Sequence, residues 1–315
     1  MIRIGTRAST LALALARELA DALRRSGVAS ELVAMRTEGD RRLDARLAAL
    51  GGKGLFVREI EDALLRGEID VAVHSLKDLP AETPEGLVLA AYPERQDPRD
   101  VLVTRTGRGF EGLARGARLG TSSARRRALA WSLRPDLVIE PLRGNVDTRL
   151  SRLASGDWDA IVLAAAGLRR LGMAPAQAVV LDPSVFVPAV GQGILAVEAR
   201  AEDRRVAAAL SGLQHAPTAT CALAERALLR GLGASCATPV AAHATLVDGR
   251  LRVTALVASE DGRRLLRADD SGPVADAEAI GATLATTLLA RGAAQVAALT
   301  PARPPTPATL GGPRA

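Results

Sequence analysis

Aromatic side chains are scarce in this 315-residue chain, since Phe, Trp and Tyr together make up 2% of it. Proteins that bind single-stranded nucleic acid stack the bases on aromatic rings, so the composition disfavours that function. Lysine is also rare: Lys53 and Lys77 are the only two, and arginine therefore supplies nearly all of the positive charge behind the formal net charge of +6. Arginine pairs with planar carboxylates, and a basic chain favours anionic partners, although a GC-rich coding sequence would produce the same arginine excess.

Cysteine and histidine are too few and too scattered for a disulfide framework or a zinc site. Cys221 and Cys236 are the only cysteines, which argues against a disulfide-stapled secreted domain. The three histidines share no ligand spacing with either cysteine, so we expect no metal. The chain also lacks a Walker phosphate loop and a G-x-S-x-G nucleophile elbow.

Long apolar runs are missing as well. The run from Leu11 to Ala16 stops at Arg17, which is short for a secretory signal. No stretch approaches the ~20 apolar residues that span a bilayer, so we expect a cytoplasmic protein with no membrane partner. With 48% hydrophobic and 24% charged residues, the chain is typical of a globular protein with two or three cores.

Strand and helix patterns alternate over the first 200 residues. This alternation predicts an α/β class with mostly parallel sheets and helices on both faces. After Pro217 the pattern changes to a helix, a meander that turns at two Asp-Gly pairs, and a final helix, which predicts a small α+β C-terminal domain. The proline-rich tail, residues 300–315, is expected to be disordered. The predicted strands of the first part cover residues 2–5, 31–36, 69–73, 101–104, 137–140, 159–164 and 194–199.

Three polar turns, residues 74–78, 120–123 and 143–145, each follow a predicted strand. Ligands of such sheets bind at the carboxyl ends of the strands, so these turns are candidate binding elements. Asp78 is the first candidate, because a carboxylate at this position offers a general acid or base and a counter-charge for a cationic intermediate. An aspartate that merely caps its turn would have the same spacing.

The turn at residues 120–123 opens a predicted helix that carries Arg125 and Arg126. Hydroxyl and backbone N–H groups at a helix start bind anions, and the arginines add bidentate donors one turn later. Arg143, Gly144 and Arg149 repeat the arrangement, since glycine lets a ligand approach the backbone. With Arg7 and Arg170 these arginines suit a ligand with many carboxylates, although solvated surface arginines would give the same pattern.

The two cysteines differ in their surroundings. Cys221 lies in an Ala/Leu helix and is expected to be a buried structural residue. Cys236 lies in a loop of small residues, where a thiol is accessible to reagents.

Five motifs and Cys236 together resemble the porphobilinogen deaminases, also called hydroxymethylbilane synthases. The resemblance covers about residues 2–295. The motifs, in chain order, are residues 51–56 (GGKGLF), 73–80 (VHSLKDLP), 120–126 (GTSSARR), 142–146 (LRGNV) and 187–193 (VPAVGQG).

The resemblance implies a monomeric enzyme with three domains. Two would be like type II periplasmic binding proteins, at residues 1–97 with 194–214 and at residues 98–193, and residues 215–299 would form the cysteine-bearing α+β domain. The enzyme would build a dipyrromethane cofactor from two porphobilinogens, held through a thioether to Cys236. It would then add four porphobilinogens with loss of ammonia and release, by hydrolysis, the linear tetrapyrrole hydroxymethylbilane (preuroporphyrinogen), a precursor of heme and other porphyrins.

By position in the motifs, Asp78 is the catalytic carboxylate that this resemblance implies. It would hold the pyrrole N–H and stabilise the cationic azafulvene that forms as ammonia leaves. Phe56 and the glycines before it resemble the family's mobile loop over the cleft. The residues implied to bind cofactor and substrate are Arg7, Ser9, Lys53, Phe56, Ser75, Lys77, Thr121, Ser122, Ser123, Arg125, Arg126, Arg143, Gly144, Arg149, Arg170 and Gln192.

Two positions depart from the family pattern. Leu15 stands where the family often has a glutamine, so a polar contact cannot be carried over there, and Ala124 stands where a larger apolar residue is common. Two other functions are alternatives to the enzyme. A solute-binding module of the same two-domain fold would not need the thiol of Cys236. An arginine-driven nucleic-acid protein is disfavoured by the scarcity of lysine and aromatics.

Overall fold

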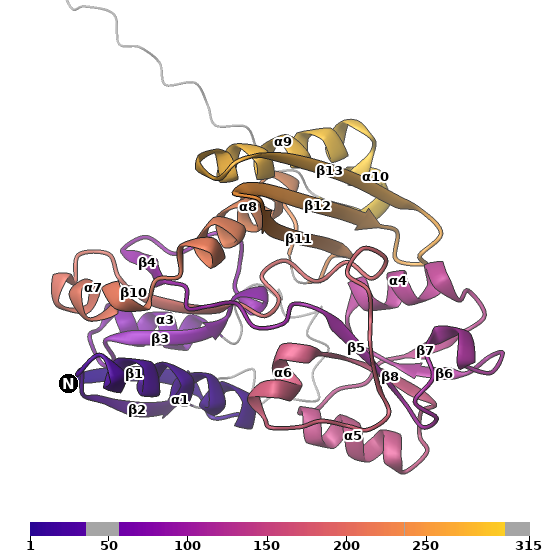
Figure 1. Ribbon diagram of the computed structural model, residues 1–315, viewed down its shortest axis with the longest axis horizontal. Helices are drawn as coiled ribbons and strands as arrows, with labels where there is room; N and C mark the ends of the chain where they lie inside the picture. The colour runs from indigo at the N-terminus through magenta and orange to yellow at the C-terminus, as the bar shows by residue number, and fades with distance from the viewer. Residues whose placement is uncertain (36–56, 236, 300–315) are drawn as a thin grey trace, which may run out of the picture.

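The computed structural model, which describes residues 1–35, 57–235 and 237–299, contains two five-stranded sheets and one three-stranded sheet (Figure 1). Three predicted site residues, Lys53, Phe56 and Cys236, and the predicted tail at 300–315 lie outside the described residues. Within the described ranges, no helix combines the length and the apolarity needed to cross a membrane.

The first sheet has the order β2-β1-β3-β10-β4. Helix α1 begins at its N-cap, Ser9, whose side chain accepts a hydrogen bond from the N–H of Ala12 at 3.4 Å. Its buried face, which includes Leu15, Leu19 and Leu23, packs on the sheet. The elements of this unit are β1 (Ile2–Arg7), α1 (Thr10–Arg25), β2 (Ser30–Met35), α3 (Arg58–Leu65), β3 (Val71–Ser75), η1 (Leu76–Asp78), β4 (Leu87–Ala91), β10 (Leu195–Arg200), α7 (Arg204–Leu210) and η3 (Ser211–Leu213).

The second sheet has the order β7-β6-β8-β5-β9. Apolar residues of β8 and β5 form its centre, and α4 covers one face with Leu129. The elements of this unit are β5 (Asp100–Thr104), η2 (Phe110–Gly112), β6 (Arg118–Gly120), α4 (Ala124–Leu133), β7 (Val138–Glu140), α5 (Val146–Ala154), β8 (Ala160–Ala164), α6 (Ala165–Arg170) and β9 (Ala178–Val180).

One strand of each five-stranded sheet runs against the other four. β10 pairs antiparallel with β3 and β4, and β5 pairs antiparallel with β8 and β9, whereas the remaining pairs are parallel. The predicted α/β class with mostly parallel strands is therefore confirmed. The two reversed strands are those that the chain enters directly after crossing between the sheets, β5 after residues 92–99 and β10 after residues 181–194.

The two crossing segments bind each other where they pass. The N–H of Gln96 donates to the carbonyl of Gly193 at 3.2 Å, and the side-chain Nε2 of Gln192 donates to the carbonyl of Pro98 at 2.7 Å. Gly193 has a φ of +86°, and a Cβ there would overlap the Gln96 carbonyl. Only glycine satisfies both requirements, so the close approach of the segments depends on this residue.

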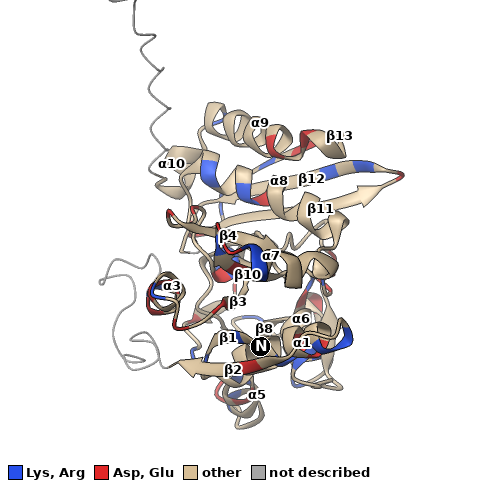
Figure 2. Ribbon diagram, turned by 90° about the vertical axis from the view of Figure 1, so that its left-hand side faces the viewer, with Lys and Arg blue, Asp and Glu red and all other residues tan. Residues whose placement is uncertain are grey.

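The third unit is an antiparallel meander, β11-β12-β13, covered by helices. The first predicted hairpin turn is confirmed: Asp248 and Gly249 have φ values of +51° and +74°, as a type I′ turn requires. Helix α8 packs on this sheet through Leu228 and on the first unit through Ala219 and Ala222 (Figures 1 and 2). The elements are α8 (Ala216–Leu232), β11 (Val240–Val247), β12 (Arg250–Ala258), β13 (Leu265–Pro273), η4 (Val274–Asp276), α9 (Ala277–Ala290) and α10 (Ala293–Ala297).

Candidate functional site

Asp78 lies at the end of a buried central strand. β3 is paired with β1 on one side and β10 on the other, and the chain then forms the single turn η1. Leu76 and Leu79 are buried on either side of Asp78, whose own side chain is exposed. The N–H of Leu76 donates to the carbonyl of Ile194, and that of Leu79 to the carbonyl of Leu76. The leucines thus anchor the turn, while the carboxylate is left accessible at the carboxyl edge of the sheet.

Lys77, beside Asp78, brings the first unit into contact with the charges of the second. Burial, and then the guanidinium of Arg126, lower the pKa of Lys77 to about 8, while Asp78 and Asp100 oppose that shift. Because Arg126 belongs to α4 and Asp100 to β5, the Asp78 turn faces residues of the second sheet. The site is therefore assembled between the two five-stranded units.

Asp100, Arg125 and Arg126 form a buried ion cluster opposite this turn. Asp100 Oδ2 lies 2.8 Å from Nη1 of Arg125, and Oδ1 accepts from Nε and Nη2 of Arg126 at 2.9 and 2.7 Å. Burial alone would raise the pKa of Asp100, but the two guanidinium groups outweigh it and lower the pKa to about 2. The cluster therefore keeps Asp100 ionised and retains a surplus positive charge.

Both arginines of this cluster are largely bonded within the protein. Nη1 of Arg125 donates to the carbonyl of Val187 at 2.7 Å, and Nη1 of Arg126 to that of Val162 at 2.9 Å. Among the described residues, Nε of Arg125 is buried without a hydrogen-bond partner. This N–H and the surplus charge are what the cluster can offer an anionic ligand. Sequence reasoning missed Asp100, since a single aspartate at the start of an apolar strand does not reveal which arginines fold against it.

The hydroxyl groups of the turn at residues 121–123 are bonded locally. Ser123 is the N-cap of α4 and accepts from the N–H of Arg126 at 3.4 Å, while its own N–H donates to Thr121 Oγ1 at 3.2 Å. Ser122 donates its hydroxyl to the carbonyl of Leu142 at 3.0 Å. The predicted helix start is confirmed, and it places these side chains between β6 and the two buried arginines.

Arg149, on α5 directly after the third turn, faces Asp78. Burial, and then Arg126, lower its pKa, while Asp78 opposes that shift. Its Nε donates to the carbonyl of Gly144 at 2.8 Å, and Gly144 has a φ of +113°, which favours glycine. Arg143, which directly precedes Gly144, is exposed. Helix α5 thus brings one guanidinium toward the carboxylate, while the turn before it carries another at the surface.

Arg7, Ser9 and Ser75 lie at the same edge as Asp78. Arg7 ends β1 and Ser75 ends β3, two neighbouring parallel strands, and Ser9 follows β1 as the cap of α1. All three are partly buried. Parallel strands bring their carboxyl ends together, which explains why residues 66 or more positions apart in the chain meet here.

Arg170 and Gln192 connect the units to each other. Nε of Arg170, on α6, lies 2.9 Å from Glu18 of α1, and its Nη2 donates to the carbonyl of Gly193 at 3.3 Å. Gln192 is buried in the crossing segment, and its Oε1 has no partner among the described residues. The described cysteine, Cys221, is buried, and burial followed by Glu225 raises its pKa to about 11, so its thiol stays protonated.

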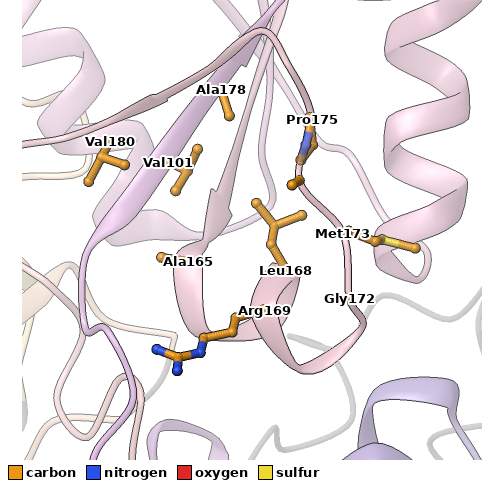
Figure 3. A pocket seen from close by; sticks show the side chains of 10 residues that line it. Val101, Ala165, Leu168, Arg169, Gly172, Met173, Pro175, Ala178 and Val180 are labelled. Atoms are coloured by element: carbon orange, nitrogen blue, oxygen red, sulfur yellow. The ribbon is translucent and has the colours of Figure 1, made fainter.

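A cavity of about 460 Å³ lies elsewhere, against the second sheet (Figure 3). Its lining is mostly apolar, with Val101, Leu168 and Met173, and Arg169 is its only charged member. None of the predicted site residues lines it, and it offers neither carboxylates nor hydroxyls. The candidate site is therefore the edge between the units.

Two family models match the chain. "Porphobilinogen deaminase, dipyromethane cofactor binding domain" matches residues 2–208, and "Porphobilinogen deaminase, C-terminal domain" matches residues 219–290. A curated relative from Syntrophobacter fumaroxidans, named porphobilinogen deaminase, is 49% identical over 298 residues, covering 94% of this chain and 96% of the relative. A relative of the same name from Syntrophotalea carbinolica is 50% identical over 299 residues, covering 94% and 95%. Among solved structures, a periplasmic substrate-binding protein of an ABC transporter from Coxiella burnetii is 17% identical, with a TM-score of 0.41 and coverage of 71% of this chain and 97% of that chain.

Proposed function

The chain belongs to the porphobilinogen deaminase family, and on that premise we propose that Asp78 catalyses its reaction opposite the arginines of the second unit, with the cofactor attached to Cys236. The enzyme is a hydroxymethylbilane synthase, a transferase of porphyrin and heme biosynthesis that joins four porphobilinogens with loss of ammonia. It carries a dipyrromethane cofactor. The resemblance seen in the sequence is thus confirmed at the level of family and reaction.

The observation that carries the residue assignment is the position of Asp78, which faces the charges of Lys77 and Arg149. Loss of ammonia from an aminomethylpyrrole leaves a cationic azafulvene. An exposed carboxylate at the carboxyl edge of the sheet can accept a hydrogen bond from the pyrrole N–H and stabilise that cation. The same group is placed to exchange protons with the leaving amine and the attacked ring.

The basic cluster is suited to the carboxylate side chains of the pyrroles. Each porphobilinogen carries an acetate and a propionate, so both cofactor and growing product are polyanions. Lys77, Arg125 and Arg126 outnumber Asp100, and the buried Nε of Arg125 has no partner among the described residues, which fits a bound carboxylate. When bound, the dipyrromethane supplies the pyrrole carbon to which the first substrate unit is joined. We assign the hydroxyls of Thr121 and Ser123 and the N–H groups at the start of α4 to the same carboxylates.

Other residues extend the positive surface along the edge. We assign Arg7, Arg143 and Arg149 to the carboxylates of the added units, with Ser9, Ser75, Ser122 and Gly144 as supporting contacts. Arg170 and Gln192 join the two units, so we assign them to ligand binding only together with closure of the units. Lys53 and Phe56 keep the binding roles that the family pattern implies. We further propose domains at residues 1–97 with 194–214, 98–193 and 215–299, and a cytoplasmic monomer.

Replacing Asp78 tests the catalytic assignment. Asp78→Asn keeps the size of the side chain but removes its charge, so we expect turnover to fall by about 100-fold or more. Asp62→Asn, an exposed change on α3, is the matched control and should keep normal turnover. Both variants should melt within a few degrees of the parent protein, because neither side chain is packed in a core. Normal turnover in Asp78→Asn would remove the carboxylate from the mechanism.

The thiol of Cys236 distinguishes the enzyme from a solute-binding module. We expect the intact mass of the purified protein to exceed the sequence mass by two linked pyrrole units. Cys236→Ser should show the bare sequence mass and no turnover, whereas Cys221→Ser should keep the added mass. A bare mass for the unsubstituted protein would favour the binding module.

A further inference from the structure

Helix α8 of the third unit packs against the Asp78 turn. Leu76 and Leu79, which flank Asp78, belong to one apolar cluster with Ala219 and Ala222 of α8. The two alanines are three residues apart and therefore lie on the same face of the helix. Their small side chains let the turn pack close to the helix backbone. The turn is thus supported by a helix that is about 140 residues away in the sequence.

Arg226 continues this face, four residues after Ala222. Only 5% of its surface is exposed, and its guanidinium binds the chain just after the Asp78 turn. Nη1 donates to the carbonyl of Pro80 at 3.0 Å, and Nη2 donates to the carbonyl of Ala81 at 2.8 Å. Nη2 also reaches Thr83 Oγ1 at 3.4 Å. Two successive carbonyls are therefore fixed by one planar group.

These bonds replace the ones that the backbone itself does not make. Pro80 has no N–H, and among the described residues no backbone–backbone hydrogen bond is recorded for residues 80–83. Without Arg226, this segment would keep only the apolar contacts of Leu79 and of Ala81, which packs against the core of the third unit, and no hydrogen bond would fix its carbonyls. Because the segment continues directly from η1, greater mobility of the segment would make the orientation of Asp78 less well defined.

The charge of Arg226 is directed at the carbonyls rather than at a carboxylate. No carboxylate among the described residues lies within ion-pair distance of it, although Glu82 and Glu198 face it from further away, together with Tyr92 and Arg230. Burial is the main cause that lowers its pKa. A guanidinium taken out of water needs strong acceptors, and charge-assisted bonds to carbonyls are about twice as strong as neutral ones.

We propose that Arg226 is a positioning residue that holds the Asp78 carboxylate in its productive orientation by binding the carbonyls of Pro80 and Ala81. The proposal rests on the catalytic role proposed for Asp78. Arg226 does not itself contact substrate, so it acts on turnover and not on substrate binding. The same helix leads through Gly233 into the loop where the chain carries Cys236, so the two functional segments share one support.

The test compares purified holoenzymes whose cofactor content is first equalised by intact mass. We expect Arg226→Gln to lower kcat by about tenfold or more while KM changes by less than about threefold. Arg226→Lys, which keeps a donor and the charge, should restore part of the loss. Arg230→Gln removes an arginine from the next turn of α8, where it contacts Glu278 and not the Asp78 turn, and it should keep normal kcat.

A double-substitution cycle separates positioning from general destabilisation. If Arg226 acts through Asp78, adding Arg226→Gln to Asp78→Asn should lower kcat little further, whereas an unrelated structural defect would multiply the two losses. The proposal is overturned if kcat of Arg226→Gln is normal, if KM alone changes, or if the losses multiply. A normal kcat in Asp78→Asn alone would instead refute the proposed function on which the inference rests.

Discussion

A single fully buried carboxylate organises the positive side of the site. Asp100 binds Arg125 and Arg126, and through them it reaches the carbonyls of Val187 in the crossing segment and Val162 in β8. Two guanidinium groups and one carboxylate leave a net positive charge that is held rigidly. Rigid charge is more useful to an anionic ligand than the same charge on mobile surface arginines, because it is already oriented before the ligand binds.

Replacing Asp100 should therefore lower the free energy of unfolding more than replacing the carboxylate of a more exposed ion pair. We expect Asp100→Asn to lower the free energy of unfolding by about 3–5 kcal/mol, since two buried guanidinium groups lose their counter-charge. Asp97→Asn, which breaks the more exposed Asp97–Arg99 ion pair, should cost about 1 kcal/mol or less. Urea unfolding at pH 7 measures both. Because the folded pKa of Asp100 is lowered to about 2, its stabilising effect is complete above the ordinary pKa near 4 and is lost as the pH falls through about 2. Equal costs for the two variants would contradict the buried role.

Helix α3 carries a carboxyl group that titrates near neutrality. Glu61 faces the buried pair His74–Glu198, whose Nε2 and Oε2 atoms are 3.1 Å apart between β3 and β10. Burial, followed by the charge of Glu198, raises the pKa of Glu61 to about 7, against the opposing effects of His74 and Arg58. The folded protein thus binds a proton here that the unfolded chain releases at lower pH.

The packing of α3 should consequently weaken as the pH rises. Between the ordinary carboxyl pKa of 4.5 and about 7 the folded state holds the extra proton, so stability falls as the pH increases through that range. The Glu61→Gln side chain cannot ionise. We therefore expect the free energy of unfolding of this variant, relative to that of the parent protein, to be about 1 kcal/mol higher at pH 8 than at pH 5, allowing for the partial exposure of Glu61. Urea unfolding at both pH values checks this, with the exposed Glu85→Gln as control. A pH-independent difference would contradict it.

Local patterns predicted local structure, and distant partners escaped them. The helix that starts after residue 123 and the Asp248-Gly249 turn follow from neighbouring residues and are confirmed, and the strand predicted at residues 69–73 is present as β3, Val71–Ser75. The antiparallel direction of β5 and β10 could not be predicted from neighbouring residues, because it depends on how the two crossing segments run between the sheets. Asp100 was missed for the same reason: its partners are 25 and 26 residues away, and charge sequence alone does not identify them.

The three units are joined at one point by a buried glutamate. Glu225 of α8 accepts from Nη1 of Arg95 at 2.7 Å, from the N–H of Gly191 at 2.6 Å and from the N–H of Ala244 at 2.8 Å. Arg95 and Gly191 belong to the two crossing segments, and Ala244 to β11. One carboxylate therefore holds the third unit to both connections between the five-stranded units.

Loss of this charge should separate the third unit from the rest. Glu225→Gln keeps the shape but leaves Arg95 without its buried counter-charge, and we expect a loss of about 3–5 kcal/mol in unfolding free energy. Because the contacts within the third sheet are untouched, calorimetry should resolve an earlier, separate transition, and limited proteolysis should cut between residues 201 and 218 more readily. Glu278→Gln, at the exposed Arg230 ion pair of the same unit, should change neither result. A single cooperative transition at the unfolding temperature of the unsubstituted protein would contradict this. It would mean that apolar packing of α8 against the Asp78 turn, rather than Glu225, keeps the third unit in place.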